Sequence, residues 1–321
     1  MDETADMSNR PIPMTEPMAA EITDMSDVRD FWLLLKPNVM SLVVFSAGVG
    51  LYIAPGTLHP VLAAIAILCI TIAAGAAAAI NNSYDADIDR VMARTRKRPT
   101  ATGRIAPADA LAYGVTLGVF SIIVMGLAVN WVAAGLLALT IGFYVLVYTM
   151  WLKRRTPQNI VIGGAAGALP PMIGWAAVTG DVSSTSIILF AIIFFWTPPH
   201  FWSLALYRTE DYAAAGVPML PVIAGSEVTR QHILAYTLLL VPIGLLPVVV
   251  GDAGLLYGIA AISLGLGFVG HAVRLWRQRT RQAATKSFRF SLVYLFGMFA
   301  ALVVDHTATE TFGLTRFWWP A

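Results

Sequence analysis

Polar and acidic residues gather at the end of an apolar stretch in the first third of the chain. Residues 81–89 read Asn-Asn-Ser-Tyr-Asp-Ala-Asp-Ile-Asp. Asn81, Asp85 and Asp89 are spaced by four, so a helix would present all three on one face. Neither aspartate has a Lys or Arg three or four residues further on, so local ion pairs do not explain them. Their oxygens suit a hard cation such as Mg²⁺, which also binds substrate phosphates.

A second acidic pair, Glu210-Asp211, follows the sixth apolar stretch within the segment Tyr-Arg-Thr-Glu-Asp-Tyr that starts at Tyr207. If both acidic groups lie at the same membrane face, they could hold two cations on one diphosphate. A charged surface loop is the alternative interpretation of Glu210-Asp211.

Basic residues flank the first acidic group and end the fourth apolar stretch. They suit phosphate oxygens, but the same residues could mark topology or contact anionic lipids. Arg90, Arg94 and Arg98 recur at helical spacing, so only one face of that run can turn to a site. The candidate cations are Lys36, Arg90, Arg94, Arg96, Lys97, Arg98, Lys153, Arg154 and Arg155.

His200 lies in Phe-Trp-Thr-Pro-Pro-His-Phe-Trp, inside an apolar stretch. A histidine within a membrane span could bind a metal or a substrate, or cap a carbonyl freed by a broken helix. The pairs Pro170-Pro171 and Pro198-Pro199 predict two interrupted helices. Interrupted helices are tolerated where they line a cavity, so we expect a central cavity, with plain kinks as the alternative.

The elements that position these residues are membrane helices. Of the 321 residues 57% are hydrophobic and 12% charged, and the mean hydropathy is +0.70, which excludes an ordinary soluble domain. The single cysteine, Cys69, excludes an internal disulfide and a thiolate cluster. Nine apolar stretches reach the bilayer-spanning length of about 20 residues: 32–53, 60–82, 109–129, 131–151, 159–179, 185–206, 232–250, 254–273 and 288–306.

Charge placement predicts the orientation. With the N-terminus in the cytoplasm, only Arg316 of the 21 Lys and Arg residues falls on the outer side. We therefore expect a mobile cytoplasmic tail at 1–30, a nine-helix domain at 31–306 and a short external tail at 307–321. The acidic start of the chain is unlike a secretory signal. Both acidic groups then face the cytoplasm, and the expected location is a bacterial inner membrane.

The motif Asn81-x-x-x-Asp85-x-x-x-Asp89 resembles the first acidic motif of the intramembrane aromatic prenyltransferase (UbiA) superfamily. That resemblance implies nine transmembrane helices around a central cavity that opens to the cytoplasmic side. The segment Trp-Thr-Pro-Pro-His-Phe-Trp resembles the branch that farnesylates protohaem IX, the haem O synthases. Segments 81–99, 151–164, 196–206 and 211–222 carry the resemblance.

Two departures stand out. Quinone-type members usually carry a second Asp-x-x-x-Asp motif, where this chain has only Glu210 and Asp211. Relatives often have Lys-Pro-Arg where residues 36–38 read Lys-Pro-Asn, which leaves Lys36 as the cation.

The resemblance implies transfer of a farnesyl group from farnesyl diphosphate to a vinyl group of protohaem IX, with addition of water, giving haem O and diphosphate. Asn81, Asp85, Asp89 and Asp211 would be catalytic, and with Glu210 they would bind Mg²⁺, the expected cofactor. The haem is substrate, and His200 is a candidate haem ligand. A haem O-processing enzyme is a candidate partner, and no nucleic acid is expected. Diphosphate would be bound by Lys36, Arg94, Arg98, Lys153, Tyr148 and Tyr207.

Two alternatives remain at this point. One is prenyl transfer to a quinone precursor such as 4-hydroxybenzoate. The other is an ion-coupled transporter, which is disfavoured because the polar residues cluster in the cytoplasmic half of the predicted helices. The sequence contains no Walker-type phosphate loop, zinc-binding His-Glu-x-x-His or Gly-x-Ser-x-Gly elbow.

Overall fold

The computed structural model describes residues 27–313. The side chains of residues 38 and 39 are not described, so the prediction that concerns the Asn38 side chain lies outside the described part. Over that range the chain forms helices and no strand, which confirms the predicted all-α membrane class. The elements are α1 (Val28–Leu34), α2 (Pro37–Ile53), α3 (Pro60–Tyr84), α4 (Ala86–Val91), α5 (Pro99–Thr102), α6 (Pro107–Ala128), α7 (Trp131–Gly142), the π-helix η1 (Phe143–Leu152), α8 (Asn159–Ala168), α9 (Pro170–Thr179), α10 (Ser184–Leu206), α11 (Thr209–Ala214), α12 (Leu220–Ile223), α13 (Gly225–Val249), α14 (Leu255–Gln278) and α15 (Arg281–Phe312).

Eight helical segments in the described range are long and apolar enough to cross a membrane. They are α3, α6, α7 with η1, α8 with α9, α10, α13, α14 and α15. The first predicted span, 32–53, is divided between α1 and α2, and its apolar part covers only Met40–Ile53. The count of nine spans therefore stays a prediction.

Several predicted boundaries shift, among them the end of α14 at Gln278 instead of 273 and the start of α15 at Arg281 instead of 288. Helix α1 begins at Val28, inside the segment 1–30 assigned to the N-terminal tail, and residues 1–26 lie outside the described residues. At the other end α15 runs to Phe312, beyond the predicted end of the span at 306. Helix α13 begins at Gly225 instead of 232 because Thr229, Arg230 and neighbouring polar residues extend it beyond the apolar stretch.

The two proline pairs behave differently. The helix is interrupted at Leu169, and α9 restarts at Pro170. In contrast, α10 runs without a break through Pro198 and Pro199, so the prediction of a second interrupted helix is wrong. Side chains of α10 do bind to carbonyls near this point: Thr197 Oγ1 donates to the Ile193 carbonyl at 2.8 Å, and Ser203 Oγ donates to the Pro199 carbonyl at 2.7 Å.

The helices form two packed groups. In one, α10 lies among α8, α13 and α15, around a core that includes Trp196, Phe268 and Tyr294. In the other, α2 and α9 approach so closely that a Cβ on Gly174 would overlap the Ala47 carbonyl. This contact fixes α2 and, with it, the turn that carries Lys36.

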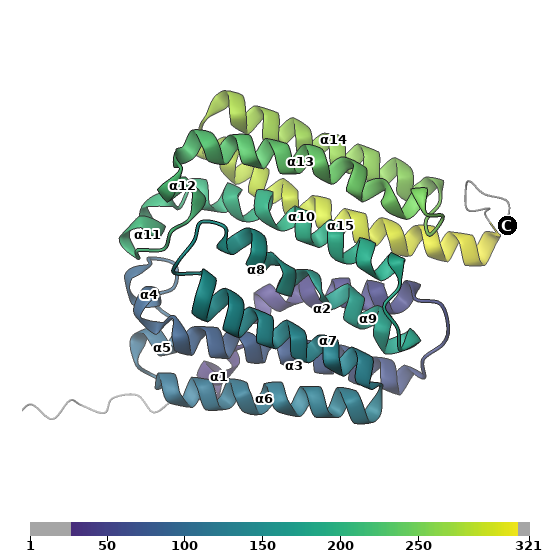
Figure 1. Cartoon of the computed structure of the whole chain (residues 1–321), viewed down its shortest axis with the longest axis horizontal. Helices are drawn as coiled ribbons and strands as arrows, with labels where there is room; N and C mark the ends of the chain where they lie inside the picture. The colour runs from purple at the N-terminus through teal and green to yellow at the C-terminus, as the bar shows by residue number, and fades with distance from the viewer. Residues whose placement is uncertain (1–26, 314–321) are drawn as a thin grey trace, which may run out of the picture.

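The short helices α4, α5, α11 and α12 all lie at one end of the long helices (Figure 1). We call this end the motif end, because the two acidic groups of the sequence are on α3–α4 and on α11. The opposite end carries short connections such as those before α7 and α14.

Candidate active site

The first acidic motif spans the junction of α3 and α4. Asn81 is in the last turn of α3, Asp85 joins the two helices, and Asp89 is on α4. The Asp85 amide donates to the Asn81 carbonyl at 3.0 Å, and the Asp89 amide donates to the Asp85 carbonyl at 2.8 Å. Helical spacing thus continues through the junction. All three side chains are buried, which is costly for carboxylates without partners.

Asp85 finds its partners far along the chain. Its Oδ2 accepts from the Lys153 ammonium, which follows η1, and from Asn81 Nδ2 at 2.6 Å. Its Oδ1 is buried and accepts no hydrogen bond, and Arg154 Nη2 lies 3.8 Å from it. Asp85 therefore has one saturated oxygen and one oxygen with free acceptor capacity.

Lys36 meets the motif from the turn between α1 and α2. Its ammonium donates to Asn81 Oδ1 at 2.9 Å, and its backbone is left-handed, with φ of 54°. Desolvation lowers the pKa of Lys36 well below its ordinary value, and the nearby charges of Arg98 and Lys153 lower it further. The charges of the two buried aspartates offset part of that effect. A strained, partly desolvated cation is a common feature of binding sites.

Asp89 pairs with Arg98, which precedes α5. Arg98 Nη1 and Asp89 Oδ2 are 2.7 Å apart, and the arginine side chain is 22% exposed. With Lys36 and Lys153, three cations thus surround two buried carboxylates. The excess of positive charge suits a phosphate group.

A second ion pair closes the outer side of the α3–α4 junction. Arg154 binds both carboxylate oxygens of Asp87, at 2.7 and 2.8 Å, and donates to the Tyr84 carbonyl at 3.0 Å. The hydrogen bond from Arg154 lowers the pKa of Asp87. Lys153 thus binds the buried Asp85 directly, whereas Arg154 binds the exposed Asp87 and lies 3.8 Å from Asp85 Oδ1.

Aromatic side chains link the motif to α11. Tyr148 of η1 packs near Tyr144, with ring centroids 5.3 Å apart, and a Cβ on Gly163 of α8 would overlap its ring. Tyr212 of α11 is desolvated, which raises its pKa, and the charges of Arg94 and Lys153 act against that rise. Tyr212 therefore lies within the electrostatic influence of Arg94 and Lys153.

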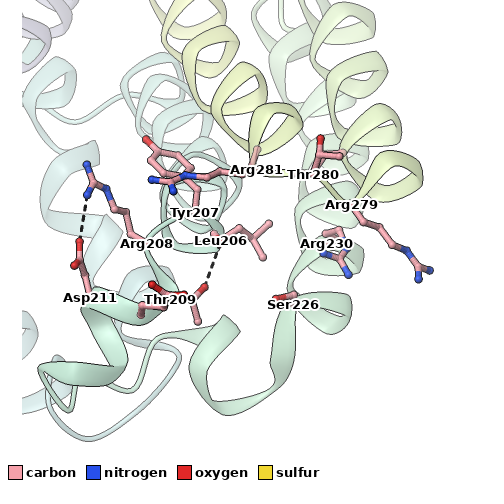
Figure 2. A pocket seen from close by; sticks show the side chains of 13 residues that line it. Leu206, Tyr207, Arg208, Thr209, Asp211, Ser226, Arg230, Arg279, Thr280 and Arg281 are labelled. Atoms are coloured by element: carbon pink, nitrogen blue, oxygen red, sulfur yellow. Dashed lines mark hydrogen bonds and ion pairs between the residues drawn. The ribbon is translucent and has the colours of Figure 1, made fainter.

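The second acidic pair is in the first turn of α11. Asp211 pairs with Arg208 at 3.3 Å and is 24% exposed, and both Glu210 and Asp211 line a pocket beside α13 and α15 (Figure 2). Within residues 27–313 no three His, Cys, Asp or Glu side chains come together as a metal site. The predicted ligand set of Asn81, Asp85, Asp89, Glu210 and Asp211 remains a prediction.

The donor chemistry at the first motif does fit a divalent cation. The free Asp85 Oδ1 is a buried carboxylate oxygen with acceptor capacity. Only two carboxylates are present there, so phosphate oxygens would have to complete the ligand shell, as Mg²⁺ commonly requires.

His200 is held within an aromatic group. Its ring stacks on Trp196 and on Phe288, with centroids 4.3 and 4.7 Å apart, and its Nδ1 lies 2.7 Å from Ser291 Oγ. These contacts occupy both ring faces and one nitrogen. Only Nε2 remains for a ligand, so the haem-ligand role stays a prediction.

Sequence reasoning did not single out Thr149 or Tyr212. Thr149 is buried and accepts from Asn81 Nδ2 at 3.2 Å. Nothing in the sequence marks Thr149, because its contact depends on η1 packing beside α3. Tyr212 follows the acidic pair directly, and that adjacency was an available signal.

Three kinds of comparison relate the chain to known proteins. The profile of the UbiA prenyltransferase family matches residues 42–302. A protoheme IX farnesyltransferase of Azorhizobium caulinodans is 59% identical over 293 residues, covering 90% of this chain and 95% of that protein. One from Granulibacter bethesdensis is 56% identical, covering 90% and 94%.

Solved structures share the fold at low sequence identity. A digeranylgeranylglyceryl phosphate synthase superposes with a TM-score of 0.73 at 17% identity, covering 87% of this chain and 98% of that one. A UbiA homologue from Archaeoglobus fulgidus, bound to DMAPP and Mg²⁺, gives 0.65 at 17% identity, covering 86% and 99%.

Proposed function

This chain belongs to the UbiA prenyltransferase family, and on that premise we propose that it transfers the farnesyl group of farnesyl diphosphate to a vinyl group of protohaem IX. Water is added in the same reaction, and the products are haem O and diphosphate. The names of the relatives support the acceptor and the prenyl group. The observation that carries the chemistry is the buried Asn81–Asp85–Asp89 face with its three cations.

The cations would bind the diphosphate. Lys36, Arg98 and Lys153 converge on the motif, and the carboxylates of Asp85 and Asp89 hold two of them in place before substrate arrives. Preorganised donors stabilise the charge that develops on a leaving group most effectively. Arg94 and Tyr212 would close this end from the α4–α5 and α11 sides.

Asn81, Asp85 and Asp89 would hold Mg²⁺, with Glu210 and Asp211 as further candidate ligands. The ion would supply charge neutralisation of the diphosphate. The fold relative bound to DMAPP and Mg²⁺ supports this cofactor, as does the free acceptor capacity of Asp85 Oδ1.

Departure of diphosphate breaks the C1–O bond and leaves an allylic cation on the farnesyl group. The terminal vinyl carbon of the porphyrin then forms the new C–C bond. Water adds to the resulting cation beside the macrocycle and releases one proton. The aromatic rings of Tyr144 and Tyr148 would shield the allylic cation from earlier attack by water.

The protein is an integral membrane protein. We place its motif end on the cytoplasmic side of a bacterial inner membrane, because almost all Lys and Arg residues then face inward. Labelling of single cysteines introduced at each end, from intact cells, tests this orientation.

Mass spectrometry of extracted haem tests the function. Membranes containing the protein are incubated with protohaem IX, farnesyl diphosphate and Mg²⁺, and a parallel sample receives 4-hydroxybenzoate as acceptor. We expect a haem whose mass increases by one farnesyl group and one water. Prenylation of 4-hydroxybenzoate with unchanged haem would refute the proposed acceptor.

A further inference from the structure

A pocket of about 290 Å³ opens at the motif end, between the α10–α11 turn, the start of α13 and the α14–α15 turn. Its lining contains the four arginines Arg208, Arg230, Arg279 and Arg281. Its size is at the lower limit of small-molecule pockets, so it suits one edge of a ligand. It does not include the buried Asp85 and Asp89.

Not all of this positive charge is neutralised. Arg208 pairs with Asp211, and both Arg230 and Arg279 pair with Glu227. Of the charged lining residues, Arg281 and Glu210 form no ion pair among the described residues. The buried Nε atoms of Arg208 and Arg230 have no hydrogen-bond acceptor. The pocket therefore offers unused donors to an anion.

Tyr207 is the point where this charge converges. Figure 2 shows the Arg281 side chain reaching from the start of α15 toward the Tyr207 ring. The guanidinium of Arg208 lies 5.9 Å from the same ring centroid. Burial raises the pKa of the Tyr207 hydroxyl, and the charges of nearby arginines, among them Arg208 and Arg281, act against that rise.

Tyr207 also contacts an aromatic ring. It meets Phe288 edge-on at 6.1 Å, and Phe288 stacks on His200. In the pocket, arginine side chains thus lie beside a Tyr207 ring that packs against Phe288. A planar macrocycle with carboxylates on one edge would match this arrangement, with its carboxylates at the arginines and its flat apolar part at the aromatic rings.

We propose that Arg281, together with Tyr207, binds the propionate carboxylates of the porphyrin acceptor, with the macrocycle extending toward Phe288. The inference rests on the proposed function, because protohaem IX carries two propionates. It assigns an acceptor-positioning role to α15, separate from the diphosphate cations on the turn before α2, the α4–α5 loop and the end of η1. An anionic lipid headgroup could also bind to these donors, and the test below distinguishes it from the propionates.

The test compares protohaem IX with its dimethyl ester, in which both propionates are neutral. Full-length wild-type protein is assayed in nanodiscs beside the Arg281→Gln variant, and Arg277→Gln, an exposed arginine outside the pocket lining, is the control. For the wild type we expect a KM about tenfold higher for the ester, since charge-assisted hydrogen bonds are lost. Arg281→Gln should raise the KM for protohaem by a similar factor and leave the KM for farnesyl diphosphate unchanged.

Several results would overturn the proposal. An unchanged acid-to-ester preference in folded Arg281→Gln excludes propionate binding at this residue. A raised KM for farnesyl diphosphate alone assigns Arg281 to the other substrate. If the substitution raises the KM equally for protohaem IX and its ester, and only in nanodiscs that contain anionic lipid, the pocket binds a lipid headgroup. A wild-type protein that converts neither acceptor refutes the proposed function itself, which separates the two failures.

Discussion

Removal of the Asp85 carboxylate should affect stability and turnover in separable ways. In Asp85→Ala the Lys153 ammonium loses its partner, and Asn81 Nδ2 loses an acceptor at 2.6 Å. Removing one partner of a buried ion pair costs about 3–5 kcal/mol. The Lys153 side chain is 17% exposed and can recover some hydration, so we expect a loss of about 3 kcal/mol.

The second variant, Asp85→Ala/Lys153→Met, removes both charges. Replacing a whole buried pair by apolar groups is often neutral, so its free energy of unfolding should return to within about 1 kcal/mol of the wild type. Turnover should not return, because both the carboxylate and a diphosphate cation are missing. We expect turnover of both variants to fall by at least about 10²–10³-fold.

The measurements are reversible unfolding in mixed micelles and chromatography of the farnesylated haem. Asp87→Ala is the matched control, because Asp87 is on the same junction but its side chain is 64% exposed. Wild-type stability in Asp85→Ala would show that the pair with Lys153 is not stabilising. Recovered turnover in the double variant would refute the role of Asp85 in binding the diphosphate.

Three further perturbations test other parts of the site. Asp87→Ala should lower the free energy of unfolding by less than about 1 kcal/mol, since the pair of Asp87 with Arg154 is exposed. The pKa of Asp87 is lowered, so its contribution to stability should be complete above the ordinary carboxyl pKa and should be lost as the pH falls through the lowered pKa. Unfolding of wild type and variant at a series of pH values measures this difference. Gly163→Leu should destabilise the protein by about 1–3 kcal/mol in the same unfolding assay, since a side chain there overlaps the Tyr148 ring, and an unaltered free energy of unfolding would contradict that packing. Lys36 loses its charge at a lower pH than an ordinary lysine, because its pKa is lowered, so the KM for farnesyl diphosphate should rise at that lower pH. Lys36→Arg should remove this rise from the pH profile of KM. A variant profile identical to that of the wild type would exclude Lys36 as the titrating group.

The spans could be predicted because their signal is local. A stretch such as 60–82 is apolar over the length of a bilayer, and α3 follows it closely, from Pro60 to Tyr84. The proline pairs could not be interpreted in the same way. Pro170-Pro171 interrupts its helix, whereas α10 continues through Pro198-Pro199, so the same dipeptide has two outcomes that depend on its tertiary surroundings.

The candidate site, too, could be predicted from the sequence only in part. Lys36, Arg98 and Lys153 were predicted to serve one substrate, and the structure brings them to one motif. It does not bring Glu210 and Asp211 into a gathered metal site with Asp85 and Asp89. The position of α11 relative to α4 depends on several long helices between them in the sequence, and no local pattern encodes it.

The membrane class, the helical face of Asn81, Asp85 and Asp89, and the resemblance to a prenyltransferase family can all be inferred from residue types at short spacing. The atoms that meet in the site depend on how the helices pack. The pairing of Asp85 with Lys153 spans 68 positions, and that of Lys36 with Asn81 spans 45. Such contacts arise when packed helices bring distant segments together, and their energy depends on burial that no single segment possesses.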